Sequence, residues 1–255
     1  MNKIIYPIAN TLTLIITLFV NYWTNTGQYN GKTVADISAR YNTLFTPAGY
    51  AFAIWGFIYL FLIVFVGYQW YSWSTGKGYD VSRAGWWLVI SNLLNASWVL
   101  IWLQDQILLS VGIMLLLLLS LIRLVLRLQI GIWEAPNGVI AFVWWPVMWY
   151  FGWIVIATVA NISAFLVSVK WHLWFADSVW TLIMIGVSTL LYFFLLKSRN
   201  LRESALVGVW GLTAIAVRQW NMRPEIAYSA LLAALLLLLS IGVHAYRRWN
   251  NSLKI

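Results

Sequence analysis

The sequence contains no cysteine and few charged residues, and both shortages narrow the class of protein. Without cysteine there is no disulfide bond, no thiolate metal site and no cysteine nucleophile. Charged residues make up 9% of the 255 residues, whereas an ordinary soluble domain has about 25%. A surface so poor in charge does not stay in water. The composition therefore argues against a soluble enzyme, a nucleic-acid-binding module and a disordered tail.

Acidic residues are especially scarce, and none falls in the middle of an apolar run. A carboxylate that relays protons across a membrane, or a lysine that holds retinal, would have to lie there. The two histidines are far apart in the sequence, so no metal site is predicted. Gly-rich phosphate loops, G-x-S-x-G and H-E-x-x-H are all missing. The sequence therefore predicts no catalytic residue and no required cofactor.

Long apolar runs are what the sequence has in abundance. Hydrophobic residues form 62% of the chain, in runs of about twenty that match a hydrocarbon core about 30 Å thick. The predicted fold is all-α, a polytopic transmembrane helix bundle embedded in a lipid bilayer. About eight spans are expected: Ile4–Trp23, Phe52–Tyr71, Gly85–Leu103, Ile107–Leu128, Val139–Val169, Phe175–Leu196, Ala205–Trp220 and Ile226–Tyr246. The fifth is long enough to be tilted, kinked near Pro146 or extended beyond the lipid.

The distribution of lysine and arginine predicts the orientation. With the N-terminus in the cytoplasm, the inner segments hold 11 basic residues and the outer segments hold 5. Both termini are therefore expected to be cytoplasmic, in a bacterial inner membrane, and the net charge of +9 requires no nucleic acid. The first span is expected to be retained, because no signal-peptide cleavage site follows it. The one long loop, from Thr24 to about Ala51, is either a cover over a binding site or a solvated connector.

Aromatic residues are also abundant, with 19 Trp among them. Those at the ends of spans suit the interfacial belt of a membrane protein. Deeper ones form stripes at helical spacing, and Asn92, Asn95 and Asn161 lie near these stripes. Such stripes are more typical of packing, but an amide in hydrocarbon needs a partner. Either an interhelical hydrogen bond or a cavity that holds a flat, mostly apolar ligand would supply that partner. The stripes are Phe52, Trp55 and Tyr59; Asn95, Trp98 and Trp102; and Trp145, Trp149 and Trp153.

Three short motifs in the second, third and fifth predicted spans carry a family resemblance. The first runs from Pro47 to Trp55 and Tyr59, the second is Leu94-Asn95-Ala96-Ser97-Trp98, and the third is Trp153, Ala157 and Asn161. With these motifs in this order, residues 1–170 resemble the TspO/MBR family, the tryptophan-rich sensory and translocator proteins. The chain departs from the family pattern where Thr46 and Trp149 replace prolines and Gly49 replaces a tryptophan.

The resemblance implies the domain organisation and the site. A TspO-like five-helix transmembrane domain is expected over residues 1–170, followed by three additional helices over 171–255. A pocket under the first loop would bind a porphyrin or haem-type ligand, as family members do, and short members are commonly dimeric, which leaves a homodimer open. The residues expected to bind ligand are Tyr41, Pro47, Trp55, Tyr59, Asn92, Asn95, Trp98, Trp153 and Asn161.

The functional hypothesis that follows is an integral membrane receptor or sensor for tetrapyrroles or similar flat hydrophobic molecules. Three alternatives stay open at the level of the sequence. The first is a transporter of a small hydrophobic solute, and the second is a protein that degrades porphyrin in light. The third is a membrane scaffold in which every tryptophan serves packing.

Overall fold

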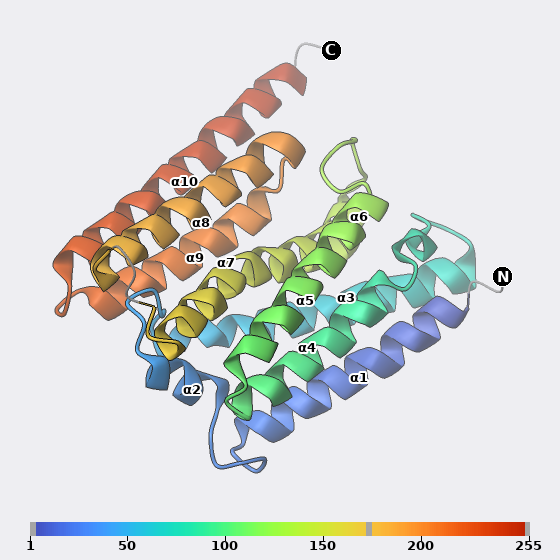
Figure 1. The fold of residues 1–255 in the computed structure, drawn as a ribbon. Helices are drawn as coiled ribbons and strands as arrows, with labels where there is room; N and C mark the ends of the chain where they lie inside the picture. The colour runs from blue at the N-terminus through green and yellow to red at the C-terminus, as the bar shows by residue number, and fades with distance from the viewer. Residues whose placement is uncertain (1–3, 172–174, 253–255) are drawn as a thin grey trace.

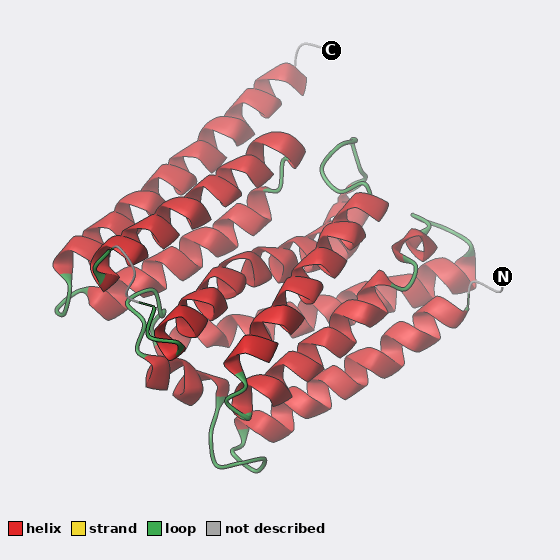
Figure 2. Cartoon of the chain, viewed as in Figure 1, coloured by secondary structure: helices red, strands yellow, loops and turns green. Residues whose placement is uncertain are grey.

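The chain is helical throughout the part described by the computed structural model, residues 4–171 and 175–252. No strand occurs in these residues (Figure 2). Eight long helices in this part correspond to the predicted spans, which confirms the all-α bundle. They are α1 (Ile5–Asn25), α3 (Ile54–Thr75), α4 (Trp87–Leu103), α5 (Ile107–Arg127), α7 (Trp145–Ser168), α8 (Asp177–Arg199), α9 (Arg202–Gln219) and α10 (Pro224–Ser252).

Short helical segments connect the long ones. The helix α2 (Val34–Tyr41) and the 3-10 helix η1 (Gly49–Ala53) precede α3, and η2 (Val81–Ala84) precedes α4. The segments α6 (Asn137–Val139) and η3 (Ile140–Trp144) lead into α7. The sequence interpretation, which treated residues 24–51 as one loop, missed α2. Its signal is present nonetheless: Thr33 and Asp36 form a reciprocal capping box that begins the helix.

Six helical segments in the described residues are long and apolar enough to cross a membrane, and these do not include α4 and α9. The helix α4 has 17 residues, at the short end of the range for a span. The helix α9 has the lowest mean hydropathy of the long helices and packs against α7, α8 and α10. A helix that meets protein on most sides needs less apolar surface than one that faces lipid.

The helix α7 is the centre of the bundle. In the segment Asn137–Ser168, which contains α7, about 61% of the most apolar stretch is buried, compared with 28–39% in the other five candidate spans. The helix α7 contacts α3 and α5 on one side and α8 and α9 on the other. Figure 1 shows α1, α3, α4 and α5 grouped apart from α8, α9 and α10, with α7 between the groups and both termini at the same end.

The beginning of α7 explains the length of the fifth predicted span. A π-helical turn at Ile140–Trp144 comes directly before Pro146, in the first turn of α7. Proline has no N–H to donate, and its ring clashes with the preceding turn of a regular helix. The wider π turn accommodates that residue. The irregularity therefore lies close to Pro146, the position of one of the three alternatives that the sequence left open.

Glycines allow the C-terminal helices to approach α7 closely. A Cβ added at Gly152 would lie 2.8 Å from both the Cα and the carbonyl oxygen of Ser204 on α9. The Ser204 hydroxyl donates to the Met148 carbonyl at 2.7 Å, and the Tyr192 hydroxyl on α8 donates to the Gly152 carbonyl at 2.8 Å. The Tyr192 ring in turn lies against Gly208. The attachment of α8 and α9 to α7 depends on these close contacts.

Candidate functional site

A hydrogen bond between α4 and α7 lies at the centre of the candidate site. The Trp98 indole N–H donates to the Asn161 side-chain oxygen at 2.9 Å, and both residues are buried. Asn161 also donates to the Ser110 hydroxyl on α5 at 2.9 Å. One turn beyond Trp98, Trp102 stacks on it with ring centroids 5.5 Å apart. The amide therefore has its partners and fixes the orientation of an indole pair.

The second aromatic wall comes from η1, α3 and α7. The Phe52 ring meets the Trp153 ring edge to face at 6.1 Å, and Trp55 does so at 6.4 Å. On the next turn of α3, Tyr59 stacks on Trp55 at 5.4 Å. Edge-to-face and offset-stacked pairs are the arrangements that aromatic rings prefer. This side of the site is therefore ordered without any ligand.

The pocket itself lies between these walls. Its lining includes four of the predicted residues, namely Pro47, Trp98, Trp153 and Asn161. Trp102, Phe52, Ala157 and Ala160 complete the apolar walls. Of the stripe on α7, only Trp153 reaches the pocket. Trp149 instead lies near Phe57 and Phe61 on α3, and Trp145 donates to Glu203 at 3.1 Å.

A cover segment, defined here as residues 42–53, closes the pocket. Its residues Phe45, Thr46, Pro47 and Phe52 line the pocket directly, and Phe45 is 1% exposed. The segment is bonded to α9 at four points, the first of which is the Arg218 guanidinium, which donates to the Asn42 side-chain oxygen at 3.3 Å. The Ala48 N–H donates to the Ala214 carbonyl at 3.0 Å. The side chains of Trp210 and Gln219 donate to the Ala51 and Leu44 carbonyls at 3.1 and 3.0 Å.

The helix α9 also contributes to the pocket wall through Gly211 and Ile215. The sequence interpretation did not include these residues, because the matching motifs end at α7. A signal for a buried helix is present in α9, where Gly and Ala recur between its larger apolar residues, while the charged residues that lower its mean hydropathy lie at its two ends. Small residues let helices approach closely in membranes.

The pocket is almost filled by its own side chains. Its free volume is about 40 Å³, whereas pockets for small molecules usually have about 300–1,000 Å³. A second cavity, of about 520 Å³, lies beside it, and Phe45 lines both. Its other lining includes Leu166 and Trp180, together with Asp177 and Arg223. Of these two cavities, the second, called the outer cavity below, has room for a large ligand without rearrangement.

The remaining predicted residues lie outside the pocket lining. Trp55 and Tyr59 form the aromatic wall behind Trp153. Asn92 and Asn95 are fully buried on α4 and point to α1, where the Asn92 amide donates to the Thr13 hydroxyl at 3.3 Å and Asn95 accepts from Asn21 at 3.1 Å. The amides Asn92 and Asn95 are therefore separate from the aromatic pocket, although the sequence analysis grouped them with it.

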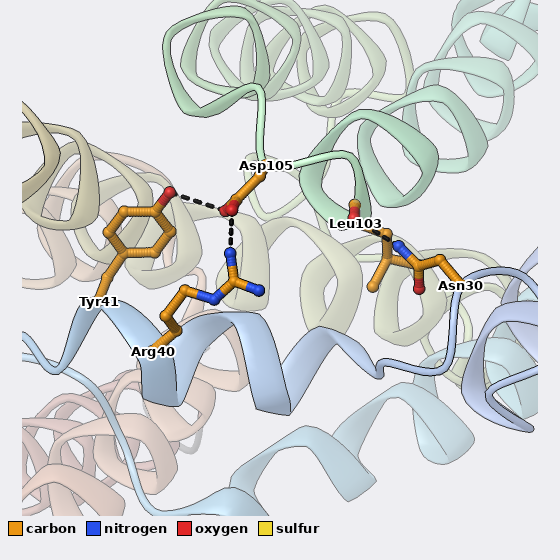
Figure 3. A network of polar contacts seen from close by, with 5 residues as sticks. All are labelled: Asn30, Arg40, Tyr41, Leu103 and Asp105. Atoms are coloured by element: carbon orange, nitrogen blue, oxygen red, sulfur yellow. Dashed lines mark hydrogen bonds and ion pairs between the residues drawn. The ribbon is translucent and has the colours of Figure 1, made fainter.

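Tyr41 lies at the end of α2 and fastens that helix to the α4–α5 connection. Its hydroxyl donates to Asp105 at 2.7 Å, and Arg40 forms an ion pair with the same carboxylate (Figure 3). Asn30 adds a bond to the Leu103 carbonyl at 2.6 Å. Partial burial, together with the hydrogen bond to Asp105, raises the pKa of Tyr41 to about 12. The hydrogen bond from Tyr41 to Asp105 therefore contributes its full stabilisation of the fold below pH 10, the ordinary pKa of tyrosine. This contribution is lost as the pH rises through 12, the pKa of Tyr41 in the folded chain.

Replacement of Asp105 by alanine is expected to loosen α2 locally. Asp105 accepts hydrogen bonds from two side chains, but the ion pair is partly exposed, so we expect a loss of about 1 kcal/mol. Amide hydrogen exchange in α2 should then become about fivefold faster. A matched control is Glu134→Ala, an exposed acid in the connection at the other end of the bundle. Unchanged exchange in α2 would show that Asp105 does not hold it.

Among the described residues, no group of three His, Cys, Asp or Glu side chains is close enough to bind a metal ion. The fold and the pocket define a class of protein: a multi-pass helical membrane protein with an aromatic pocket beneath a short covering segment. A family model described as TSPO-like protein matches residues 7–243, and the chain belongs to this family. The match extends through α8, α9 and most of α10. Searches of curated proteins and of solved structures gave no match.

Proposed function

We propose that this membrane protein is a receptor or sensor that binds a flat hydrophobic ligand, such as a tetrapyrrole, in the aromatic pocket. The observation that carries the proposal is the arrangement of three indoles, those of Trp98, Trp102 and Trp153, around one pocket with an amide at its edge. Aromatic faces stack on flat apolar rings, and a hydrogen-bonded amide supplies a polar edge. Membership of the TSPO-like family supports the same assignment.

Ligand entry requires the cover segment to move. A tetrapyrrole cannot enter 40 Å³, but displacement of Phe45 would join the pocket to the outer cavity of about 520 Å³. The cover segment is held to α9 by four hydrogen bonds, each worth about 1 kcal/mol net. Contacts of this size permit opening at a modest cost. The proposal therefore includes a closed state, which the structure represents, and an open state that takes the ligand.

Quenching of tryptophan fluorescence by protoporphyrin IX tests this proposal. In detergent, we expect saturable quenching by the unmodified chain and about fivefold weaker affinity in Trp153→Phe, because the smaller ring loses contact area. The matched control is Trp73→Phe at the opposite end of α3, where the indole is 44% exposed. Its affinity should not change.

Two results would contradict the proposal. Quenching that never saturates would indicate partition of the porphyrin into the micelle. Equal affinity in Trp153→Phe, Trp73→Phe and the unmodified chain would place any bound porphyrin elsewhere. A measurement of flux into vesicles would then distinguish a transporter of small hydrophobic solutes from a scaffold.

A further inference from the structure

A stripe of polar side chains runs along α1 and faces the protein interior. Asn10, Thr13, Thr17, Asn21 and Thr24 recur every three or four residues, and none is more than 8% exposed. The opposite face of α1 is apolar and open to the lipid, with Leu12 57% exposed and Ile16 47% exposed. The polar side chains therefore lie where α1 meets its neighbours, α3 and α4.

Buried amides on those neighbours complete what we call the polar seam: the five α1 residues above, Gln69 on α3, and Asn92 and Asn95 on α4. Asn10 donates to Gln69 at 2.9 Å, and the Thr17 hydroxyl donates to the backbone carbonyl of Asn92 at 2.9 Å. From Asn10 to Asn21 the seam covers about 16 Å at 1.5 Å per residue. This distance is about half of the hydrocarbon thickness.

The direct bonds leave the seam incomplete. Asn10 Oδ1, Gln69 Nε2, Asn92 Oδ1 and Asn95 Nδ2 are buried atoms that form no hydrogen bond of normal geometry with the described residues. Their four side chains are at most 3% exposed. Two of these atoms are acceptors and two are donors. The Tyr150 hydroxyl approaches Asn95 without forming such a bond. If the amides served only to join helices, side-chain pairs would be expected to satisfy them, as in most buried polar groups.

The seam begins at a cavity. A hollow of about 310 Å³ at the end of the bundle that carries the N-terminus is lined by Gln69, together with Pro7, Ser72 and Ser82. Gln69 therefore belongs both to the cavity and to the seam. Its unpartnered nitrogen is the first of the four atoms, and the other three follow along α1 and α4 toward the middle of the bundle.

We propose that the polar seam binds a file of water molecules that enters from this cavity and extends to the level of Asn95. Water both donates and accepts, so it can satisfy unpartnered oxygens and nitrogens alike. The named seam residues are amides and hydroxyls without charge, so the site suits water and comparably small neutral hydrogen-bonding molecules, and the file of water would also admit a small probe ion. This role is independent of ligand binding in the aromatic pocket.

The absence of native cysteine makes a direct test possible, with single cysteines placed on the seam and on the lipid face. The variants Thr13→Cys and Leu12→Cys lie at nearly the same depth on α1. The probe is Ag⁺, added to the protein in lipid nanodiscs, in which both ends of the bundle meet solution. It binds the thiolate sulfur, and the thiol proton leaves to water. The protein is then unfolded, and a fluorescent maleimide measures the thiols that remain.

We expect Thr13→Cys to lose its free thiol about 1,000-fold faster than Leu12→Cys. Burial in hydrocarbon raises the pKa of a thiol by about three units or more, which lowers the fraction of reactive thiolate about 1,000-fold. Thr17→Cys and Ile16→Cys form a second pair, deeper in the bundle, and should differ in the same direction. This second pair keeps the test valid if a variant of the first pair does not fold.

The proposed entrance is tested by Gln69→Leu in the Thr13→Cys chain. Leucine has a similar size but offers no hydrogen bond at the cavity, so we expect Ag⁺ to react at least about tenfold more slowly. Equal rates on the seam and on the lipid face, or no reaction on either, would overturn the hydrated seam. An unchanged rate in Gln69→Leu would overturn entry from this cavity. Neither result would bear on porphyrin binding, which is measured separately.

Discussion

Gly152→Val is expected to be strongly destabilising, by about 3 kcal/mol, because it forces α7 and α9 apart. A Cβ at this position would lie 2.8 Å from two backbone atoms of Ser204, and backbone atoms within a helix cannot move individually. The displacement would also break the bonds from Ser204 to the Met148 carbonyl and from Tyr192 to the Gly152 carbonyl. Thermal unfolding in detergent should occur roughly 6–12 °C lower.

The matched control is Gly186→Val on α8. A Cβ at Gly186 meets no described atom within 4 Å, and glycine has a low helix propensity, so this change should be neutral or slightly stabilising. If both variants unfold at the temperature of the unmodified chain, the close contact between α7 and α9 does not hold the two groups of helices together.

The effect of Gly152→Val should extend to the pocket. The helix α9 supplies Gly211 and Ile215 to the pocket wall and holds the cover segment through Trp210 and Gln219. A shift of α9 would therefore loosen the cover although Gly152 itself does not line the pocket. The C-terminal helices thus take part in closing the site, and they are not simply appended to it.

The sequence predicts the long helices well because their signal is strong. Each of the eight predicted spans overlaps a long helix in the described residues, and a run of about twenty apolar residues has few other solutions in a membrane. Helical spacing places Trp153 and Asn161 on one face of α7, but it does not show which helix that face meets. The expectation that Trp98 on α4 shares a pocket with them came from the resemblance to the TspO/MBR family. The role of α9 was not predictable, since nothing in its own sequence states which helix it packs against.

The division of the predicted site into two parts also lies beyond the sequence. Asn92, Asn95 and Asn161 are all amides in apolar helices, and spacing alone cannot assign their partners. Asn161 turns to Trp98 and Ser110, whereas Asn92 and Asn95 turn to Thr13 and Asn21 on α1. The polar stripe on α1 is visible in the sequence at positions 10, 13, 17, 21 and 24. Its hydrogen-bond partners depend on which helices pack against it, and the sequence does not show this.

Asn161→Leu is expected to cost about 2 kcal/mol and to disorder the indole pair. Leucine has nearly the volume of asparagine but accepts no hydrogen bond, so the buried Trp98 N–H would lose its partner. An unsatisfied buried donor costs about 1–3 kcal/mol. Ser110 keeps its bond to the Ile107 carbonyl at 2.7 Å, so the loss concentrates on Trp98. Unfolding in detergent measures the cost, and protoporphyrin titration measures the effect on the pocket.

A double-mutant cycle separates this hydrogen bond from packing. Trp98→Phe removes the donor, and Asn161 then retains its bond to Ser110 at 2.9 Å. Combining Trp98→Phe with Asn161→Leu leaves neither partner unsatisfied, so the double variant should be more stable than the sum of the two single losses predicts, by at least about 1 kcal/mol. Strictly additive losses would mean that the contact contributes only volume. If the two losses of stability are coupled and Asn161→Leu also weakens porphyrin binding, the amide acts in the pocket by holding Trp98 in place.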